Sequence, residues 1–475
     1  MIVEIKQKVT RNLLNIPGWR TKRKIVVIES DDWGSIRMPS REVYEEFLNY
    51  EIRVDRDPYC RYDSLATPED LEALFEVLTS VKDKNGRNAL LTANTVIANP
   101  DFKKIRENGF NRYFYEPFTE TLKRRPITFN SFEIWKQGMK SGIFHPQFHG
   151  REHLNVKKWM QRLQSNDYMT RLAFDFGTFG LTPAVDARIR DKYMGAFNSG
   201  LDEDIEYYNL LLEEGLNLFE NTFGYRSLSF IPTTYTWSPK IEPELFVNGV
   251  RFLQGMVHQR IPLDDNTTFR YKKNNFTGFR SAAGLVYITR NAYFEPAQNP
   301  GLDWVGDCLN RLEVSFRWHK PAVISMHRLN VIGAIDVRNR KANLLLLKSL
   351  LSKLTKRWPD VEFMSSDELG NLIIADYFNN VIWYWNRSVT DALKFNVNVP
   401  AGQLKVIAGT GEAASGADGL GIQTSMYNPR GLAYDTATQT LYISEYSSHK
   451  IKALSSSGVL TTFMGAGSSD TNGGV

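Results

Sequence analysis

Residues 25–34, which read IVVIESDDWG, decide the fold. Four β-branched residues in succession are typical of a strand buried on both faces, because a strand with one solvent-facing side alternates apolar and polar residues. Asp31 and Asp32 stand where this run ends. Adjacent carboxylates repel each other unless a cation or a proton relieves the repulsion, so the strand end is either a candidate metal or acid–base site or a solvated turn.

Further short strands and helices alternate along the first 370 residues. Residues 286–289 and 322–326 are again apolar runs too short for helices. Thr67 and Pro68 have the character of a helix N-cap and first helical residue, and residues 205–219 and 342–354 repeat the helical spacing of apolar positions. This α/β alternation predicts a parallel sheet, most simply a distorted (β/α) barrel.

The chain changes character near residue 370. Glycine becomes about twice as frequent after that point, and short strands separated by Gly, Asn and Ser replace the helices. Residues 372–377 (LIIADY) are repeated as 441–446 (LYISEY), and 402–411 as 458–467, with residues 387–400 as an insertion in the first copy. We therefore predict two domains, 1–370 and 371–475, the second an all-β segment of about two propeller-like blades.

Three of the seven histidines lie four residues apart, at His145, His149 and His153. On a helix this spacing places imidazoles on one face, close enough to share a metal ion. The alternative is that each is a structural histidine with an ordinary hydrogen-bond partner. The clustering favours a metal site.

A fourth histidine, His327, ends the apolar run 322–326. In an α/β barrel the carboxyl ends of the strands form the active-site face, so polar groups at strand ends converge on one pocket. We expect Asp31, Asp32 and His327 to meet there, although a histidine bonded to a nearby backbone carbonyl would give the same pattern.

Together these stretches resemble the polysaccharide deacetylase family with the NodB homology domain. The family's Asp-Asp-Gly motif is matched by Asp31-Asp32-Trp33-Gly34, with an inserted Trp. Its His-x-x-x-His motif is matched by His149 and His153, or one step earlier by His145 and His149, and its late Leu-x-His motif by the strand that ends in His327. The segment after residue 370 is similar to NHL repeats, the blades of a β-propeller.

Ser325 stands in place of the Leu of the late motif, and the sequence departs from the family in two further places. Ile231 stands where the family has the arginine that orients its catalytic carboxylate, and Arg226, Arg280 or Arg290 could replace it. The acidic residue that supports the catalytic histidine has only Asp303, in Asp303-Trp304, as a candidate. Residues 155–225 are extra sequence that we expect to reshape the substrate groove.

The resemblance implies a metal-dependent mechanism. Asp32, His149 and His153, with His145 as the alternate, would bind one divalent ion, and Zn²⁺ is favoured by this N/O ligand set. Asp31 would be the general base and His327 the general acid that protonates the leaving amine.

The function implied is removal of acetyl groups from an N-acetylated glycan, or less favoured an O-acetylated one. Trp33, Tyr235 and Trp237 are candidates for stacking on sugar rings, although aromatic residues more often serve core packing. Two alternatives stay open: a metal-dependent hydrolase of another non-peptide C–N amide, and a non-catalytic protein that binds glycan or protein. The C-terminal repeats are a candidate surface for a protein partner.

Composition narrows the function classes. Net charge is only +5, from 58 basic and 53 acidic residues, and no basic stripe suggests nucleic-acid binding. No apolar run is long enough to span a membrane, and the charged N-terminal segment lacks the apolar core of a signal peptide. We therefore expect a cytoplasmic protein with no nucleic-acid or membrane partner.

Overall fold

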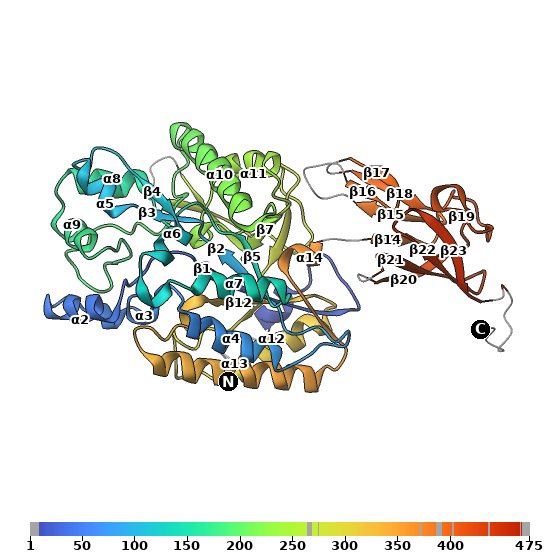
Figure 1. The fold of residues 1–475 in the computed structure, drawn as a ribbon, viewed down its shortest axis with the longest axis horizontal. Helices are drawn as coiled ribbons and strands as arrows, with labels where there is room; N and C mark the ends of the chain where they lie inside the picture. The colour runs from blue at the N-terminus through green and yellow to red at the C-terminus, as the bar shows by residue number, and fades with distance from the viewer. Residues whose placement is uncertain are drawn as a thin grey trace. The chain divides into compact units, whose positions relative to one another are not determined.

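The computed structural model forms two compact units, Met1–Leu369 and Gly370–Val475. It describes residues 9–263, 268–273, 275–370, 373–385, 392–400, 403–435, 438–465 and 467. The colours of Figure 1 follow the chain through each unit, from blue at the N-terminus to red at the C-terminus.

The first unit is built on a parallel sheet of nine strands. Eight of them follow the order β10-β7-β6-β5-β2-β1-β12-β11, and β13 pairs with β1. Their bounds are β1 (Lys24–Trp33), β2 (Leu91–Thr95), β5 (Phe144–Phe148), β6 (Ser229–Phe230), β7 (Phe252–Gly255), β10 (Val286–Thr289), β11 (Ala292–Tyr293), β12 (Ala322–His327) and β13 (Val361–Met364). Within the described chain, β10 and β11 are not hydrogen-bonded to each other, so the sheet is a curled, open barrel. The predicted distorted (β/α) barrel is confirmed.

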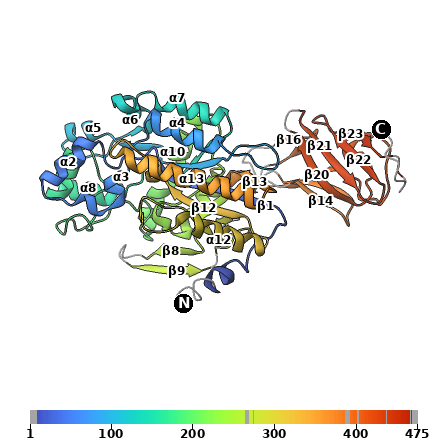
Figure 2. The ribbon, with the colours of Figure 1, turned by 90° about the horizontal axis from the view of Figure 1, so that it is seen from below.

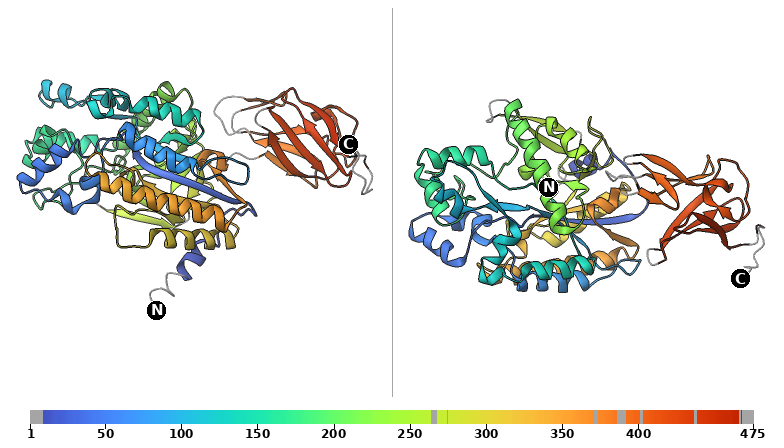
Figure 3. Two further views of the ribbon diagram at one scale, coloured as in Figure 1. Left: turned by 60° about the horizontal axis from the view of Figure 1, so that its bottom comes forward. Right: turned by 45° about the horizontal axis from the view of Figure 1, so that its top comes forward.

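Helices surround this sheet (Figure 1). They are α2 (Arg41–Asn49), α3 (Pro58–Tyr62), α4 (Pro68–Thr79), α5 (Phe102–Glu107), α6 (Phe118–Lys123), α7 (Ser131–Lys140), α8 (Val156–Gln164), α9 (Tyr168–Asp175), α10 (Asp202–Phe223), α11 (Glu242–Val247), α12 (Trp304–Arg317), α13 (Val337–Arg357) and α14 (Ser366–Gly370). The predicted start of α4 is confirmed, since Thr67 and Asp70 form a reciprocal capping box before and after Pro68. Helix α13 contacts both α4 and α12 (Figure 2, and in orange in Figure 3, left).

The two faces of β1 explain its unbroken apolar run. Val26 and Ile28 pack in the main core with residues of the surrounding helices. Ile25 and Val27 point the other way, into a smaller cluster to which β7, β10 and β12 each contribute a side chain: Phe252, Ile288 and Val323. Strands from around the curl meet in that cluster, so it is the barrel interior.

Two short antiparallel pairs complete the first unit: β3 (Ala98–Pro100) with β4 (Tyr115–Pro117), and β8 (His258–Pro262) with β9 (Phe269–Lys273). No helix in the part of the chain that the structure describes combines the length and the apolar composition needed to cross a bilayer.

The second unit consists of antiparallel sheets, drawn in orange to red in Figure 3. One sheet has β14 (Ile373–Asp376), β15 (Val381–Trp385) and β18 (Leu404–Ala408); the other has β19 (Gly419–Leu420), β23 (Val459–Met464), β22 (Lys450–Leu454), β21 (Thr440–Glu445) and β20 (Pro429–Asp435); a separate hairpin joins β16 (Ala392–Lys394) to β17 (Val397–Val399). Strands β14, β15 and β18 recur in order as β21, β22 and β23, as the repeated sequence predicts. Residues 371–372, 386–391 and 401–402 of the first copy lie outside the described residues.

Candidate active site

The interior row of side chains on β1 continues into the site. Because side chains alternate along a strand, Glu29 and Asp31 follow Ile25 and Val27 into the barrel interior. Asp32 then adopts a φ of 73°, a left-handed conformation that disfavours residues other than glycine but that aspartate tolerates better than most. Such an outlier at a strand end is a sign of functional constraint. All three carboxylates are buried.

Asp32, His149 and His153 form a buried cluster whose ligand atoms lie within 4.8 Å of one another. Oδ1 of Asp32 is 3.5 Å from Nε2 of His149 and 3.3 Å from Nε2 of His153. Nδ1 of His149 donates to the carbonyl oxygen of Ile231 at 2.7 Å, which leaves the Nε2 lone pair directed at the cluster. Burial lowers the pKa of His153 to about 3, so its ring is neutral and able to ligate. This donor set fits one divalent ion.

The second carboxylate oxygen of Asp32 is held by an arginine. Arg37 donates to Oδ2 at 2.9 Å, and its guanidinium also lies 3.7 Å from Asp63. Burial opposes ionisation of Asp32, but Arg37, then His153, outweigh it and hold the pKa of that carboxyl well below its usual range. Asp32 is therefore ionised and ready to ligate.

The prediction that the three histidines share one face of a helix is wrong. Strand β5 ends at Phe148, and His149 and His153 lie in the loop that follows it. His145, the alternate ligand, belongs to β5; its Nε2 is 3.1 Å from Asp367 and its ring stacks on Tyr225. His145 is thus placed outside the cluster.

Asp31 is held by a buried arginine. Arg290 donates to both oxygens of Asp31 at 2.6 Å and, through Nε, to Glu29 at 2.6 Å. Asn94 donates to Asp31 as well, at 2.8 Å. Burial favours the protonated form of Asp31, but the Arg290 guanidinium more than offsets this and lowers its pKa to about 2.

Among the three arginines considered as replacements at Ile231, the geometry selects Arg290, directly after β10. Arg226 instead donates to Asn248, and Arg280 to the carbonyl oxygen of Gly284. The arginine that holds Asp31 thus follows β10, whereas Ile231, the position expected for it, follows β6.

His327 continues the interior row of β12, after Val323 and Ser325. Its Nε2 lies 3.8 Å from Asp31, and its Nδ1 lies 2.6 Å from Oε1 of Glu295. Burial disfavours the charged ring, but Glu295, then Asp31, outweigh burial and raise the pKa of His327 to about 9. His327 is therefore protonated at neutral pH.

Glu295 is the acidic residue that contacts His327, and the sequence did not indicate it; the expectation that Asp303 fills this place is wrong. Asp303 caps α12 by accepting from the backbone of Gly306, and Trp304 donates to the carbonyl oxygen of Asn299. Glu295 stands two residues after the short strand β11. An acidic residue just beyond a strand end is a sequence pattern that could have indicated Glu295. The strand has only two residues, however, and so short a strand is hard to recognise in a sequence.

These groups open into a cleft of about 450 Å³. Asp31, Asp32, His149, His153 and His327 all line it. The long insertion predicted to shape the groove also contributes to its wall, through Gly180, Thr182, Lys192, Met194, Gly195 and Asn198.

Of the three aromatic residues proposed to stack on sugar rings, one lines the cleft. Tyr235 does, and its hydroxyl accepts from Arg290 at 2.8 Å. Trp33 and Trp237 are wrong, because each is only 1% exposed. Trp33 packs edge-on against Trp135 and Phe144 in the core. Both indole groups fill the core, which is the more frequent use of aromatic residues.

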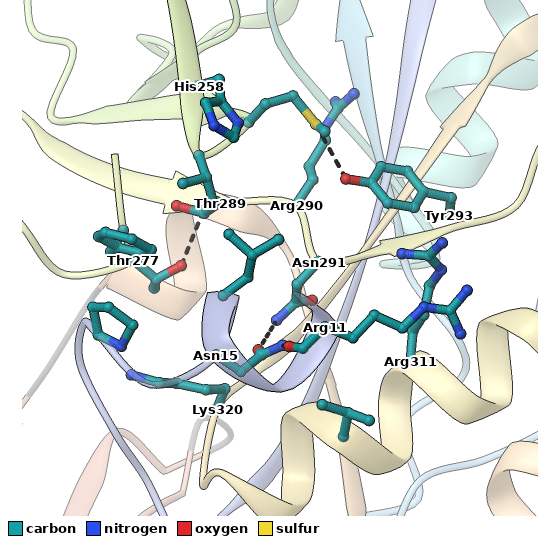
Figure 4. A pocket seen from close by; sticks show the side chains of 16 residues that line it. Arg11, Asn15, His258, Thr277, Thr289, Arg290, Asn291, Tyr293, Arg311 and Lys320 are labelled. Atoms are coloured by element: carbon teal, nitrogen blue, oxygen red, sulfur yellow. Dashed lines mark hydrogen bonds between the residues drawn. The ribbon is translucent and has the colours of Figure 1, made fainter. Parts of the chain in front are cut away.

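A smaller cavity of about 90 Å³ lies where the N-terminal segment meets β10, β11 and α12 (Figure 4). Its cations have partners within the protein. Arg11 and Arg311 both bond to Asp307, and Lys320 donates to the carbonyl oxygens of Gly18 and Trp19. The larger cleft is therefore the candidate active site.

No family model and no curated protein matches the chain. Among solved structures, it is similar to a putative polysaccharide deacetylase from Mycobacterium smegmatis, with 12% identity and a TM-score of 0.39 over 74% of this chain and 91% of that one. It is also similar to a probable polysaccharide deacetylase from Pseudomonas aeruginosa PAO1 (10%, 0.38, 73% and 90%). A third match is the 4-alpha-glucanotransferase from Thermococcus litoralis (9%, 0.36, 74%), of which the chain spans only 40%. These likenesses are distant, so any functional proposal must stand on the site geometry.

Proposed function

We propose that the protein is a metal-dependent hydrolase that removes the acetyl group from an N-acetylated glycan. The observation that carries the proposal is a pair of facing groups with opposite protonation preferences. Asp31, with a pKa of about 2, and His327, with a pKa of about 9, lie 3.8 Å apart beside the Asp32–His149–His153 cluster. Environments that push two pKa values apart in this way mark a base and an acid.

Asp32, His149 and His153 would hold the ion, with Zn²⁺ favoured by the two imidazoles and one carboxylate. When bound, a divalent ion supplies Lewis acidity to the scissile carbonyl and to the attacking water. The protein's own part is to keep the His153 ring neutral through burial and to orient the His149 ring through the hydrogen bond from its Nδ1 to Ile231.

Asp31 accepts a proton from the water that attacks the acetyl carbon. Because Arg290 stabilises its ionised form, Asp31 holds that proton only transiently. The C–N bond then breaks as Nε2 of His327 gives its proton to the leaving nitrogen. Glu295 accepts the Nδ1 hydrogen of His327 and stabilises its charge until that transfer. The products are acetate and a free amine.

For the second unit we propose NHL-type repeats that bind a protein partner. Support comes from the repeated order of its strands, β14-β15-β18 and β21-β22-β23. A pull-down with the full chain and with a chain ending at residue 370 tests this, because a partner captured equally by both would contradict it. A cytoplasmic location stays a prediction.

The decisive experiment measures acetate release from chitooligosaccharides and peptidoglycan fragments. We expect Asp31→Asn to lower kcat by about 100-fold or more, since it removes the proton acceptor. Asp303→Asn is the matched control, because Asp303 only caps α12, and it should leave kcat unchanged.

Activity that survives Asp31→Asn would show that Asp31 is not the base. Absence of acetate from every glycan, with hydrolysis of another amide, would favour the C–N amide hydrolase. A preparation that holds no divalent ion and hydrolyses nothing would favour the non-catalytic binding protein.

A further inference from the structure

Two cations line the cleft without an acidic partner. Within the described chain, no carboxylate lies within 4.0 Å of a side-chain nitrogen of Arg260 or Lys192. Arg37, which lines the same cleft, differs because it is paired with Asp32 and Asp63. Lys192 is exposed, whereas Arg260, on β8, is half-buried.

Arg260 is fixed and yet incompletely bonded. Its guanidinium lies over the ring of Phe269 at 4.3 Å, on the partner strand β9, which restricts its rotamers. Its backbone is held on both sides, through the pairing with Tyr271 and through the amide of Trp237, which donates to its carbonyl oxygen. Its Nε is buried and bonds to none of the described residues. An unmade bond at a buried charged donor is unfavourable, so an acceptor from a ligand is expected there.

A second unmade bond belongs to another residue that lines the cleft. Oδ1 of Asn198 is buried and bonds to none of the residues that the structure describes. Asn198 comes from the extra segment 155–225 and Arg260 from the β8–β9 hairpin, so two separate segments that line the cleft each hold an unused polar atom. Hydroxyl groups of a sugar can donate to Asn198, but only an acceptor can satisfy Arg260.

We propose that the cleft is specific for a glycan that carries an anionic group beside the N-acetyl sugar, with Arg260 as the specificity-determining residue. The guanidinium binds carboxylate and phosphate oxygens through the same planar donors, so the anion is a uronate-type carboxylate or a phosphate ester. Exposed Lys192 adds long-range attraction. This inference rests on the proposed deacetylase function and names its substrate class.

The test compares three N-acetylated ligands: chitotetraose, which is neutral, hyaluronan tetrasaccharide, which carries carboxylates, and UDP-N-acetylglucosamine, which carries a diphosphate. Their dissociation constants are measured by calorimetry on the full chain with Asp31→Asn as an inactive background. Arg260→Gln, Arg260→Lys and the control Arg270→Gln are then added; Arg270 is exposed on the same hairpin and does not line the cleft.

We expect at least one anionic ligand to bind about tenfold or more tightly than chitotetraose, because a charge-assisted hydrogen bond contributes at least that factor. Arg260→Gln should abolish the preference, Arg260→Lys should restore part of it, and Arg270→Gln should leave it intact. Added NaCl should weaken the binding of the anionic ligand more than the binding of the neutral one. Tighter binding of the hyaluronan tetrasaccharide would indicate a carboxylate, and tighter binding of UDP-N-acetylglucosamine would indicate a phosphate.

Three results would overturn the inference: equal affinity for all three ligands, no binding of either anionic ligand, or an Arg260→Gln effect as large on chitotetraose as on the anions. Acetate assays on the wild-type chain separate this from the proposed function. Acetate released equally well from chitotetraose would leave the deacetylase in place and remove the anion specificity. Arg260-dependent binding without acetate release would keep the anion specificity and remove the proposed deacetylase function.

Discussion

At the scale of single residues, the proposed acid and the proposed base differ in the charge that supports them. Arg290 stabilises the ionised form of Asp31, and Glu295 stabilises the protonated form of His327. As a general acid, His327 is active below its pKa of about 9 and loses activity as pH rises through that value. The rate of acetate release should therefore fall on the alkaline side of the pH profile.

Glu295→Gln removes the carboxylate that raises the pKa of His327. The alkaline limb of the kcat profile should move to lower pH by about one unit or more, because an adjacent opposite charge shifts a pKa by that much. An NMR titration of the His327 ring checks the same shift without turnover. The control is Glu313→Gln, on α12, where half-buried Glu313 pairs with Arg317 and Arg357. An unchanged limb in Glu295→Gln would show that His327 does not set it.

The metal cluster offers a comparison between two histidines four residues apart. His149→Ala should lower the bound divalent ion from one per chain to a small fraction of that, because a three-ligand site loses a ligand. His145→Ala should retain the ion, since His145 contacts Asp367 instead of the cluster. Metal content after dialysis is measured by elemental analysis. Equal loss in both variants would mean that His149 acts through folding.

The site residues that could be predicted from the sequence are those that lie close to one another along the chain. Asp31 and Asp32 are adjacent, and His149 and His153 are four apart, so their co-location is visible before folding. Arg290 and Glu295 support Asp31 and His327 across separations of 259 and 32 residues, which leave no local pattern. The indole rings of Trp33 and Trp237 were misjudged because burial is decided by tertiary packing.

At the scale of elements, the turn η3 (Thr233–Tyr235) stores strain next to the cleft. Thr234 and Tyr235 have φ values of 56° and 55°, a left-handed region that is unfavourable for a β-branched or aromatic residue. This turn carries the Tyr235 hydroxyl to Arg290. The alternation of strands and helices could be predicted from the apolar runs and from the Thr67 cap. The strained turn η3 and the loop after β5 could not be predicted, because their conformations depend on contacts between strands.

Thr234→Gly should relieve that strain. We expect the free energy of unfolding to rise by about 0.5–1 kcal/mol, because the left-handed penalty of roughly 1–2 kcal/mol exceeds the entropy lost with glycine. The value of kcat should fall, because Tyr235 is then less firmly placed. Urea denaturation and acetate release measure the two quantities. The matched control, Thr236→Gly, has an extended φ of −120° and should only destabilise. A lower stability in Thr234→Gly would contradict the strain argument.

At the scale of the whole molecule, the two units differ in how well their sequence predicts them. The first could be predicted as a barrel because buried parallel strands have unbroken apolar runs, and β1 packs against a core on each of its two faces. In the second, the repeats predict paired antiparallel sheets, and the described residues share one core around Ile382, Ile407, Leu441 and Ile443.

A chain that ends at residue 370 tests whether the site belongs to the first unit alone. Every group of the candidate site, from Glu29 to His327, lies within Met1–Leu369, and so do Arg290 and Glu295 that support it. We therefore expect the shortened chain to bind one divalent ion and to release acetate with kcat/KM within about twofold of the full chain, since units with separate cores fold independently. Calorimetry of the full chain should show two unfolding transitions, of which the shortened chain keeps one. If the shortened chain folds with a single transition and binds the ion yet no longer releases acetate, the second unit takes part in substrate binding, which would contradict its proposed role as a separate partner surface.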